Sequence, residues 1–129
     1  MNQDTFLWRQ VHPDWVHEGR PTRQTFDPMG KKEISVSDGD MISAEDVWSK
    51  HVHTFNRKSV GVLSVTVADC EDNELSVRPD PVDNAPEHVA VIYPAAAKTQ
   101  IRAVSEILLD RSLQHGWKYA AENQVRPRL

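Results

Sequence analysis

An alternation of apolar and polar side chains between Ser59 and Ala68 sets the first limit on how this chain can fold. Every second residue from Leu63 to Val67 is apolar, and the residues between them are serine and threonine. This period of two predicts a β-strand with one face in a core. A second segment, His88–Tyr93, is almost wholly apolar, which is typical of a central strand. The chain therefore contains a buried sheet.

Two segments with helical spacing accompany these strands. The first begins at Ser43, a good N-cap, carries Glu45 and Asp46 in its first turn, and ends near Asn56. The second runs from about Ala95 to Gln114 and repeats apolar residues at helical spacing, among them Ile101, Val104, Ile107 and Leu108.

Shorter signals complete the pattern of elements. Thr5–Val11 and Glu33–Val36 favour strands, and the stretch from Asp14 to Phe26 is loop-like. Residues 68–75 suit a short helix or a turn, and residues 76–86, which hold three prolines, suit an ordered loop or an edge segment.

This order of elements predicts a small two-layer α/β or α+β domain. We expect a mixed β-sheet with the two main helices on one of its faces. The 129 residues match the size of one domain, so we expect residues 1–129 to form a single unit with frayed ends at about 1–4 and 122–129.

Charge and composition exclude several classes of protein. The net charge of −4 argues against general binding of nucleic acid, which needs a basic face. Cys70 is the only cysteine, so no disulfide can form within the chain. The first ten residues do not resemble a signal peptide, and no apolar run approaches the ~20 residues that span a bilayer. We therefore expect a cytoplasmic protein that does not bind membranes.

Polar residues gather in the first loop and around the proline-rich segment. Arginine side chains there can clamp a phosphate or carboxylate, and histidine can act as acid or base near neutral pH. The alternative is that these side chains are solvated or paired with nearby carboxylates. The candidate ligand-binding residues are Arg9, His12, Arg20, Ser35, Asp80 and His88.

Metal and thiol chemistry are less favoured. The spacing of His12 and His17 matches no metal motif, and His51 and His53 would diverge on a helix. The acidic neighbours of Cys70 disfavour a thiolate. We expect neither a metal nor another cofactor.

The polar and turn residues also form an ordered set. It resembles a group of short bacterial proteins that have no assigned activity. The likeness spans Leu7 to Val91 and implies one compact bacterial cytosolic domain. It rests on the segments Arg9–Pro13 (RQVHP), Gly19–Thr22 (GRPT), Ile34–Val36 (ISV), Pro79–Pro81 (PDP) and Pro86–His88 (PEH).

Two functions from different classes fit these observations. The first is a non-enzymatic binding component of a larger assembly, such as a defence or toxin–antitoxin-like system, whose protein partner is encoded nearby. Tryptophan and arginine are enriched at binding hot spots, and Trp15, Arg23 and Trp117 are its candidate interface residues. The alternative is a small enzyme or binding domain for a nucleotide-like anion, with His12 and His88 as the acid and base if it is an enzyme.

Overall fold

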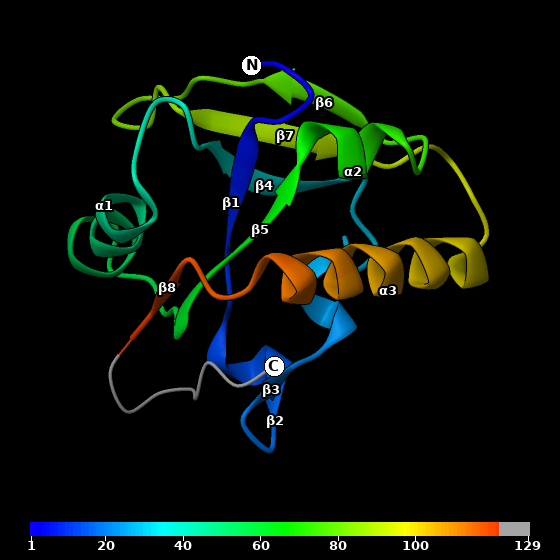
Figure 1. Cartoon of the computed structure of the whole chain (residues 1–129), viewed down its shortest axis with the longest axis horizontal. Helices are drawn as coiled ribbons and strands as arrows, with labels where there is room; N and C mark the ends of the chain where they lie inside the picture. The colour runs from blue at the N-terminus through cyan, green and yellow to red at the C-terminus, as the bar shows by residue number, and fades with distance from the viewer. Residues whose placement is uncertain (122–129) are drawn as a thin grey trace.

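A six-stranded sheet forms the centre of the molecule, and a computed structural model describes residues 1–121 (Figure 1). Its strand order is β6-β7-β4-β1-β5-β8, and every pairing is antiparallel. The strands are β1 (Phe6–Gln10), β4 (Glu33–Asp38), β5 (Gly61–Thr66), β6 (Ser76–Pro79), β7 (His88–Ile92) and β8 (Tyr119–Ala120).

Helices cover the sheet. α1 (Ala44–Ser49) continues into a π-helical turn (Lys50–Thr54), α2 (Val67–Glu71) follows β5 directly, and α3 (Lys98–His115) is the longest helix. The Ser43 side chain accepts a hydrogen bond from the Asp46 N–H, so it is the N-cap that the sequence indicated. The prediction of a small α+β domain with two main helices is confirmed.

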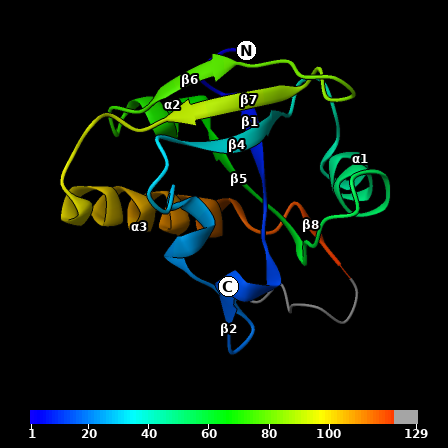
Figure 2. The same ribbon diagram turned by 180° about the vertical axis from the view of Figure 1, so that it is seen from behind.

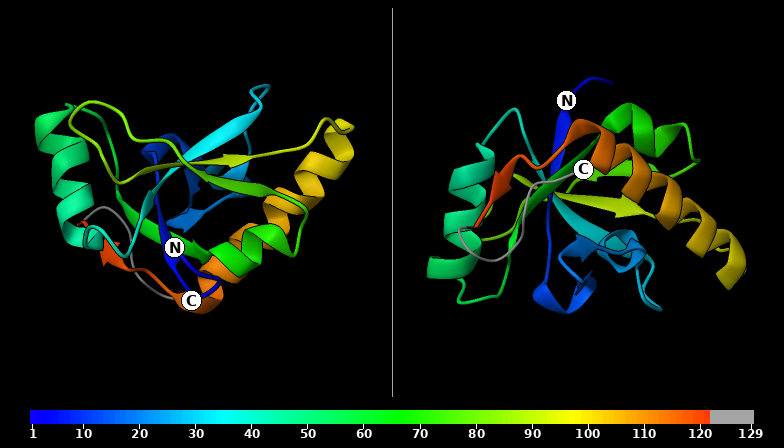
Figure 3. Two further views of the ribbon diagram at one scale, coloured as in Figure 1. Left: turned by 90° about the horizontal axis from the view of Figure 1, so that it is seen from above. Right: turned by 60° about the horizontal axis from the view of Figure 1, so that its bottom comes forward.

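The arrangement of the helices and strands differs from the expectation in two respects. The sheet is antiparallel rather than mixed, and α1 and α3 lie on opposite faces of it (Figures 2 and 3). Leu7 and Leu63 belong to the core beneath α3, whereas their chain neighbours Trp8 and Val62 pack with α1. β5 is buried on both faces from its first residue to Val65, so it needs a helix on each side.

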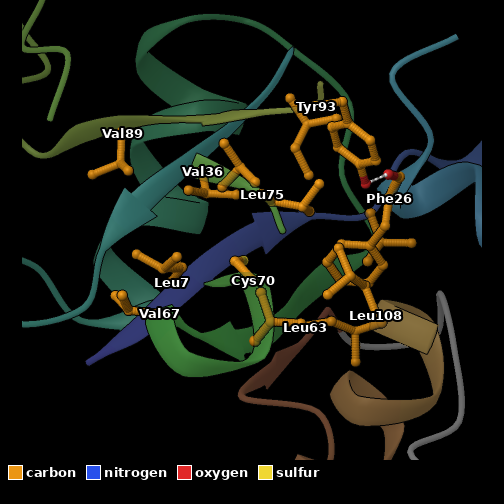
Figure 4. Close-up of a cluster of buried hydrophobic side chains, with 14 of the residues drawn as sticks. Leu7, Phe26, Val36, Leu63, Val67, Cys70, Leu75, Val89, Tyr93 and Leu108 are labelled. Carbon is orange, nitrogen blue, oxygen red and sulfur yellow. Dashed lines mark hydrogen bonds between the residues drawn. The ribbon is translucent and has the colours of Figure 1, made fainter. Parts of the chain in front are cut away.

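The main core lies between the sheet and the helices α2 and α3 (Figure 4). Phe26 is fully buried there, and its carbonyl accepts hydrogen bonds from the Tyr93 hydroxyl and from Ser105 Oγ at 3.3 Å. In α3, Leu108 is fully buried, but Ile107 is 41% exposed, so Ile107 does not belong to the apolar face predicted for this helix.

The first loop is built from short elements between β1 and β4. They are the 3-10 turn η1 (Pro13–Trp15), a hairpin of β2 (Val16–His17) and β3 (Arg20–Pro21), and the 3-10 turn η2 (Arg23–Phe26). At one edge of the sheet, β6 ends on Pro79, which agrees with the edge segment expected for 76–86. Across residues 1–121, the structure contains no helix of the length and apolarity that crossing a membrane requires.

Candidate functional site

β1 and β4 separate halfway along their length, and Arg9 occupies the gap. Their register covers only Leu7↔Asp38 and Trp8↔Ser37, after which β1 remains paired with β5 alone. Arg9 Nε donates to the Thr25 carbonyl at 2.6 Å, and Arg9 Nη1 donates to the Ser35 carbonyl at 2.9 Å. The guanidinium thus replaces strand pairing at the point where the sheet opens.

The charge of Arg9 has no carboxylate beside it. Its guanidinium lies 4.9 Å from the centre of the Trp15 ring, a cation–π contact, and no salt bridge to it occurs within residues 1–121. Burial lowers the pKa of Arg9 to about 10, so the group still carries its charge at neutral pH. A half-buried cation that has no counter-ion among residues 1–121 attracts an anion.

A cleft of about 670 Å³ opens at this gap. Its walls come from β1, β4, the C-terminal end of the α1 segment, and the loop that precedes β7. Its lining includes four cationic side chains, two carboxylates and three large aromatic rings: Arg9, Lys50, Arg57 and Lys58; Asp83 and Glu87; Trp8, Trp15 and Phe55. The cleft is therefore locally cationic, although the whole chain has a net charge of −4.

The π-helical turn brings the end of the α1 segment to the cleft. The Phe55 N–H donates to the Lys50 carbonyl at 3.0 Å, which closes a wider turn than an α-helix has. Asn56 then adopts a left-handed conformation (φ 53°) and ends the helix, as the sequence indicated. Wide turns of this kind are frequent at functional sites.

Three histidines line the cleft, and local contacts fix the orientation of two of them. His12 Nδ1 accepts a hydrogen bond from the Asp14 N–H at 3.0 Å, so the neutral ring carries its proton on Nε2. His88 Nδ1 lies 2.9 Å from the Asp80 carbonyl and 3.2 Å from Asp80 Oδ2, both of which are acceptors. His88 therefore holds its proton on Nδ1 and leaves Nε2 free to accept one.

The third histidine, His51, is half-buried among positive charges. Burial lowers its pKa, as do the nearby charges of Arg57, Arg9 and His12, against a hydrogen bond to the Lys58 carbonyl that raises it. His51 is therefore neutral at pH 7. Its neighbour His53 is exposed, so this pair diverges as the sequence predicted.

Two further polar features belong to the lining of the cleft, the Lys50–Glu87 ion pair and the side-chain amide of Gln10. Lys50 Nζ lies 2.6 Å from Oε1 of Glu87, whose side chain is almost fully buried. Gln10 Nε2 donates to the Val47 carbonyl at 3.2 Å, but Gln10 Oε1 is buried and has no partner within residues 1–121. A buried acceptor without a partner is uncommon in proteins and is suited to a donor on a ligand.

The structure brings together most of the residues that the sequence singled out. Arg9, His12, Ser35 and His88 all line the cleft, as does the interface candidate Trp15. Asp80 contacts His88 from outside the lining.

Three predicted residues lie elsewhere. Arg20 is exposed on the β2–β3 hairpin, and Arg23 Nη1 pairs with Asp27 Oδ2 at 2.7 Å. Trp117, predicted as an exposed interface residue, is instead half-buried against the main core. It follows α3 closely and packs beside Gly61, so its position in a loop does not expose it.

Several residues of the cleft were missed by the sequence analysis. They are Trp8, Gln10, Lys50, His51, Phe55, Arg57, Lys58, Asp83 and Glu87. The available signal was the run of basic and aromatic residues at the end of the first helix. The sequence analysis used that run only to place the end of the helix near Asn56.

Cys70 lies outside the cleft and is fully buried in the main core. Burial raises the pKa of its thiol to about 12, and the charges of Asp69 and Glu71 add to this effect. We expect the native protein not to react with a thiol-specific reagent such as DTNB at pH 8, and the protein in denaturant to release one equivalent of product. Rapid reaction of the native protein would contradict the burial described here.

No protein-family model, curated protein or solved structure matches this chain. Within residues 1–121, no group of three or more histidine, cysteine or carboxylate side chains is placed to hold a metal ion.

Proposed function

We propose that this protein binds a nucleotide-like anionic ligand in the cleft between β1, β4 and the end of the α1 segment. The observation that carries the proposal is convergence. Arg9, His12, Ser35 and His88 come from separate segments of the chain and line one cavity, together with Lys50 and Arg57.

The chemistry of the lining suits each part of such a ligand. Cationic side chains attract phosphate, and Arg9 forms no salt bridge with a carboxylate of residues 1–121, so its charge is available to a ligand. Aromatic rings provide stacking surfaces for a base, and Phe55, at the edge of the cleft, is the most exposed of the three. Gln10 Oε1 offers an acceptor to an N–H or O–H group.

A catalytic role for the histidines is the further part of this proposal. His88 presents a free Nε2 that can accept a proton, and His12 presents an Nε2–H that can donate one. The two rings line the same cleft, which is what an acid–base pair requires.

The geometry gives less support to the other hypothesis, which is a non-enzymatic binding component whose protein partner is encoded nearby. Of its three interface residues, Trp15 lies in the cleft, Arg23 is paired with Asp27, and Trp117 packs on the core. Only one of these three side chains therefore lines the cleft. A defence or toxin–antitoxin-like context stays a prediction.

The test is calorimetric titration of the purified protein with nucleoside 5′-monophosphates, diphosphates and ribose 5-phosphate. We expect binding of at least one nucleotide, and affinity at least about tenfold lower in the double variant Arg57→Ala/Lys58→Ala, since each lost charge contact contributes on the order of 1 kcal/mol. Binding should also weaken as salt is added.

The matched control is Lys32→Ala/Arg111→Ala, which removes the same two residue types from exposed positions that do not line the cleft. If no nucleotide binds, or if both double variants lose affinity equally, the cleft is not the site and the proposal fails.

A further inference from the structure

The inference of this subsection rests on the function proposed above, the binding of an anionic ligand in the cleft. It starts from the uneven distribution of charged side chains in that cleft. Arg9, His12 and Arg57 all act on His51, and we call these four side chains the cationic end of the cleft; the ionic pairs Lys50–Glu87 and His88–Asp80 involve none of them. Arg9 and His12 both pack against the Trp15 ring, at 4.9 Å and 5.7 Å from its centre. Arg57 follows His51 closely, and its N–H donates to the His51 carbonyl at 3.0 Å.

The carboxylates at the cleft contact other side chains than these four. Glu87 pairs with Lys50, Asp80 contacts His88, and Asp83 lies in the same loop. Carboxylates and the free Nε2 of His88 accept hydrogen bonds from hydroxyl groups and repel phosphate. A ligand with a phosphate at one end and a sugar or other hydroxylated group at the other would fit this polarity.

The side chain of His51 is influenced by the other three members of the cationic end. The groups that lower its pKa come from three different segments: Arg9 from β1, His12 from the turn after it, and Arg57 from the loop after the helix. Among residues 1–121 no carboxylate raises the pKa of the ring, and only its contact with the Lys58 backbone does so. The ring therefore stays neutral while the cleft is empty.

We infer that the cationic end formed by Arg9, His12, His51 and Arg57 is a subsite for a phosphate monoester, and that His51 takes up a proton when this phosphate binds. A monoester is largely dianionic at pH 7, since its second pKa is about 6. Two negative charges placed among these side chains reverse the local field that keeps His51 neutral. A phosphodiester carries one negative charge and exerts a weaker effect.

Proton uptake fixes the sign of the pH dependence. Because His51 binds its proton more tightly in the complex than in the free protein, affinity falls as the pH rises from about 6.5 to 8. Below about pH 6 the ligand loses its second charge, so affinity falls there as well. Affinity should therefore be highest between these two ranges.

The experiment measures protons directly. The tightest-binding nucleoside 5′-monophosphate of the panel is titrated at pH 7 in buffers that differ in ionisation enthalpy, such as PIPES, HEPES and Tris. We expect uptake of roughly half a proton to one proton per phosphate bound. The matching 3′,5′-cyclic monophosphate, a diester, should bind at least about tenfold more weakly.

His51→Asn and His51→Gln should both abolish the proton uptake and weaken binding, whereas His53→Asn, two residues away and exposed, should change neither. Thermal unfolding of each variant verifies that it is folded. Binding without proton uptake, or equal affinity for the cyclic diester, would overturn this inference and leave the proposed function standing. Failure of every nucleotide to bind would overturn both.

Discussion

Replacing Phe26 with alanine is expected to lower the free energy of unfolding by about 3–5 kcal/mol, the usual cost of emptying a large aromatic site in a core. Phe26 is fully buried between the sheet and α3. Its backbone carbonyl is held by Tyr93 and Ser105, so the segment cannot move inward freely to fill the space. The cavity left by the missing ring should therefore stay open, and the loss of unfolding free energy should lie near the upper end of this range.

Urea denaturation followed by circular dichroism measures this change, with the slope of the transition unchanged if unfolding stays two-state. The matched control is Phe55→Ala, because Phe55 is 36% exposed and should cost no more than about 1 kcal/mol. A loss below about 1 kcal/mol for Phe26→Ala would show that Phe26 is not a central core residue.

The substitution Phe26→Ala should also weaken ligand binding in the cleft. Thr25 precedes Phe26 and offers its carbonyl to Arg9 Nε at 2.6 Å. Loosening η2 would therefore loosen the guanidinium, and we expect weaker nucleotide binding even under conditions in which the variant is fully folded.

Gly61→Ala is expected to lower the free energy of unfolding by about 1–3 kcal/mol or more through overpacking. A Cβ at this position would lie 2.5 Å from the Tyr119 carbonyl oxygen and 2.9 Å from the Trp117 ring. The nearer of these atoms belongs to the backbone of β8, which pairs with β5 at Gly61↔Ala120. Relief of the clash therefore requires β8 to separate from the sheet.

Thermal and urea unfolding of Gly61→Ala give the magnitude of this effect. Ser76→Ala, a change to a small residue at an exposed position of the edge strand β6, should stay within about 0.5 kcal/mol of the native protein. Native-like stability of Gly61→Ala would mean that the approach of β8 to Gly61 is not required by the fold.

The strands and helices were predictable where the period of the sequence was strong. The expected ranges agree to within a few residues with β1, β4, β5, β7 and α3, and also with α1 once its π-helical turn is included. β8 was missed because a two-residue strand has no period, and its pairing with β5 depends on the path of the chain after α3. The polar side chain of Ser64 suggested that one face of β5 is exposed to solvent, but Ser64 is fully buried. That misreading placed both helices on one face.

The candidate site was predictable residue by residue but not as a whole. Arg9, His12 and His88 were chosen because their side chains carry chemistry, and the antiparallel pairing of β1, β4 and β7 then brought them to one cleft. The wall formed by Lys50, His51 and Phe55 could not be predicted, because it depends on the π-helical turn and on which face α1 covers.

The position of α1 has a consequence for how a ligand enters. Among the described residues, the cluster beneath α1 contains only Ala44, Val47 and Val62 as buried apolar residues, whereas the core beneath α3 is several times larger. Trp8, Ile42, Trp48 and Tyr119 pack against this cluster but are only partly buried. Elements with fewer buried apolar contacts open at lower free energies, so we expect α1 to detach before the sheet and α3 unfold. The segment that carries Lys50, His51 and Phe55 is therefore the part of the cleft that can open by local unfolding, while the Arg9 side is held by the rest of the sheet.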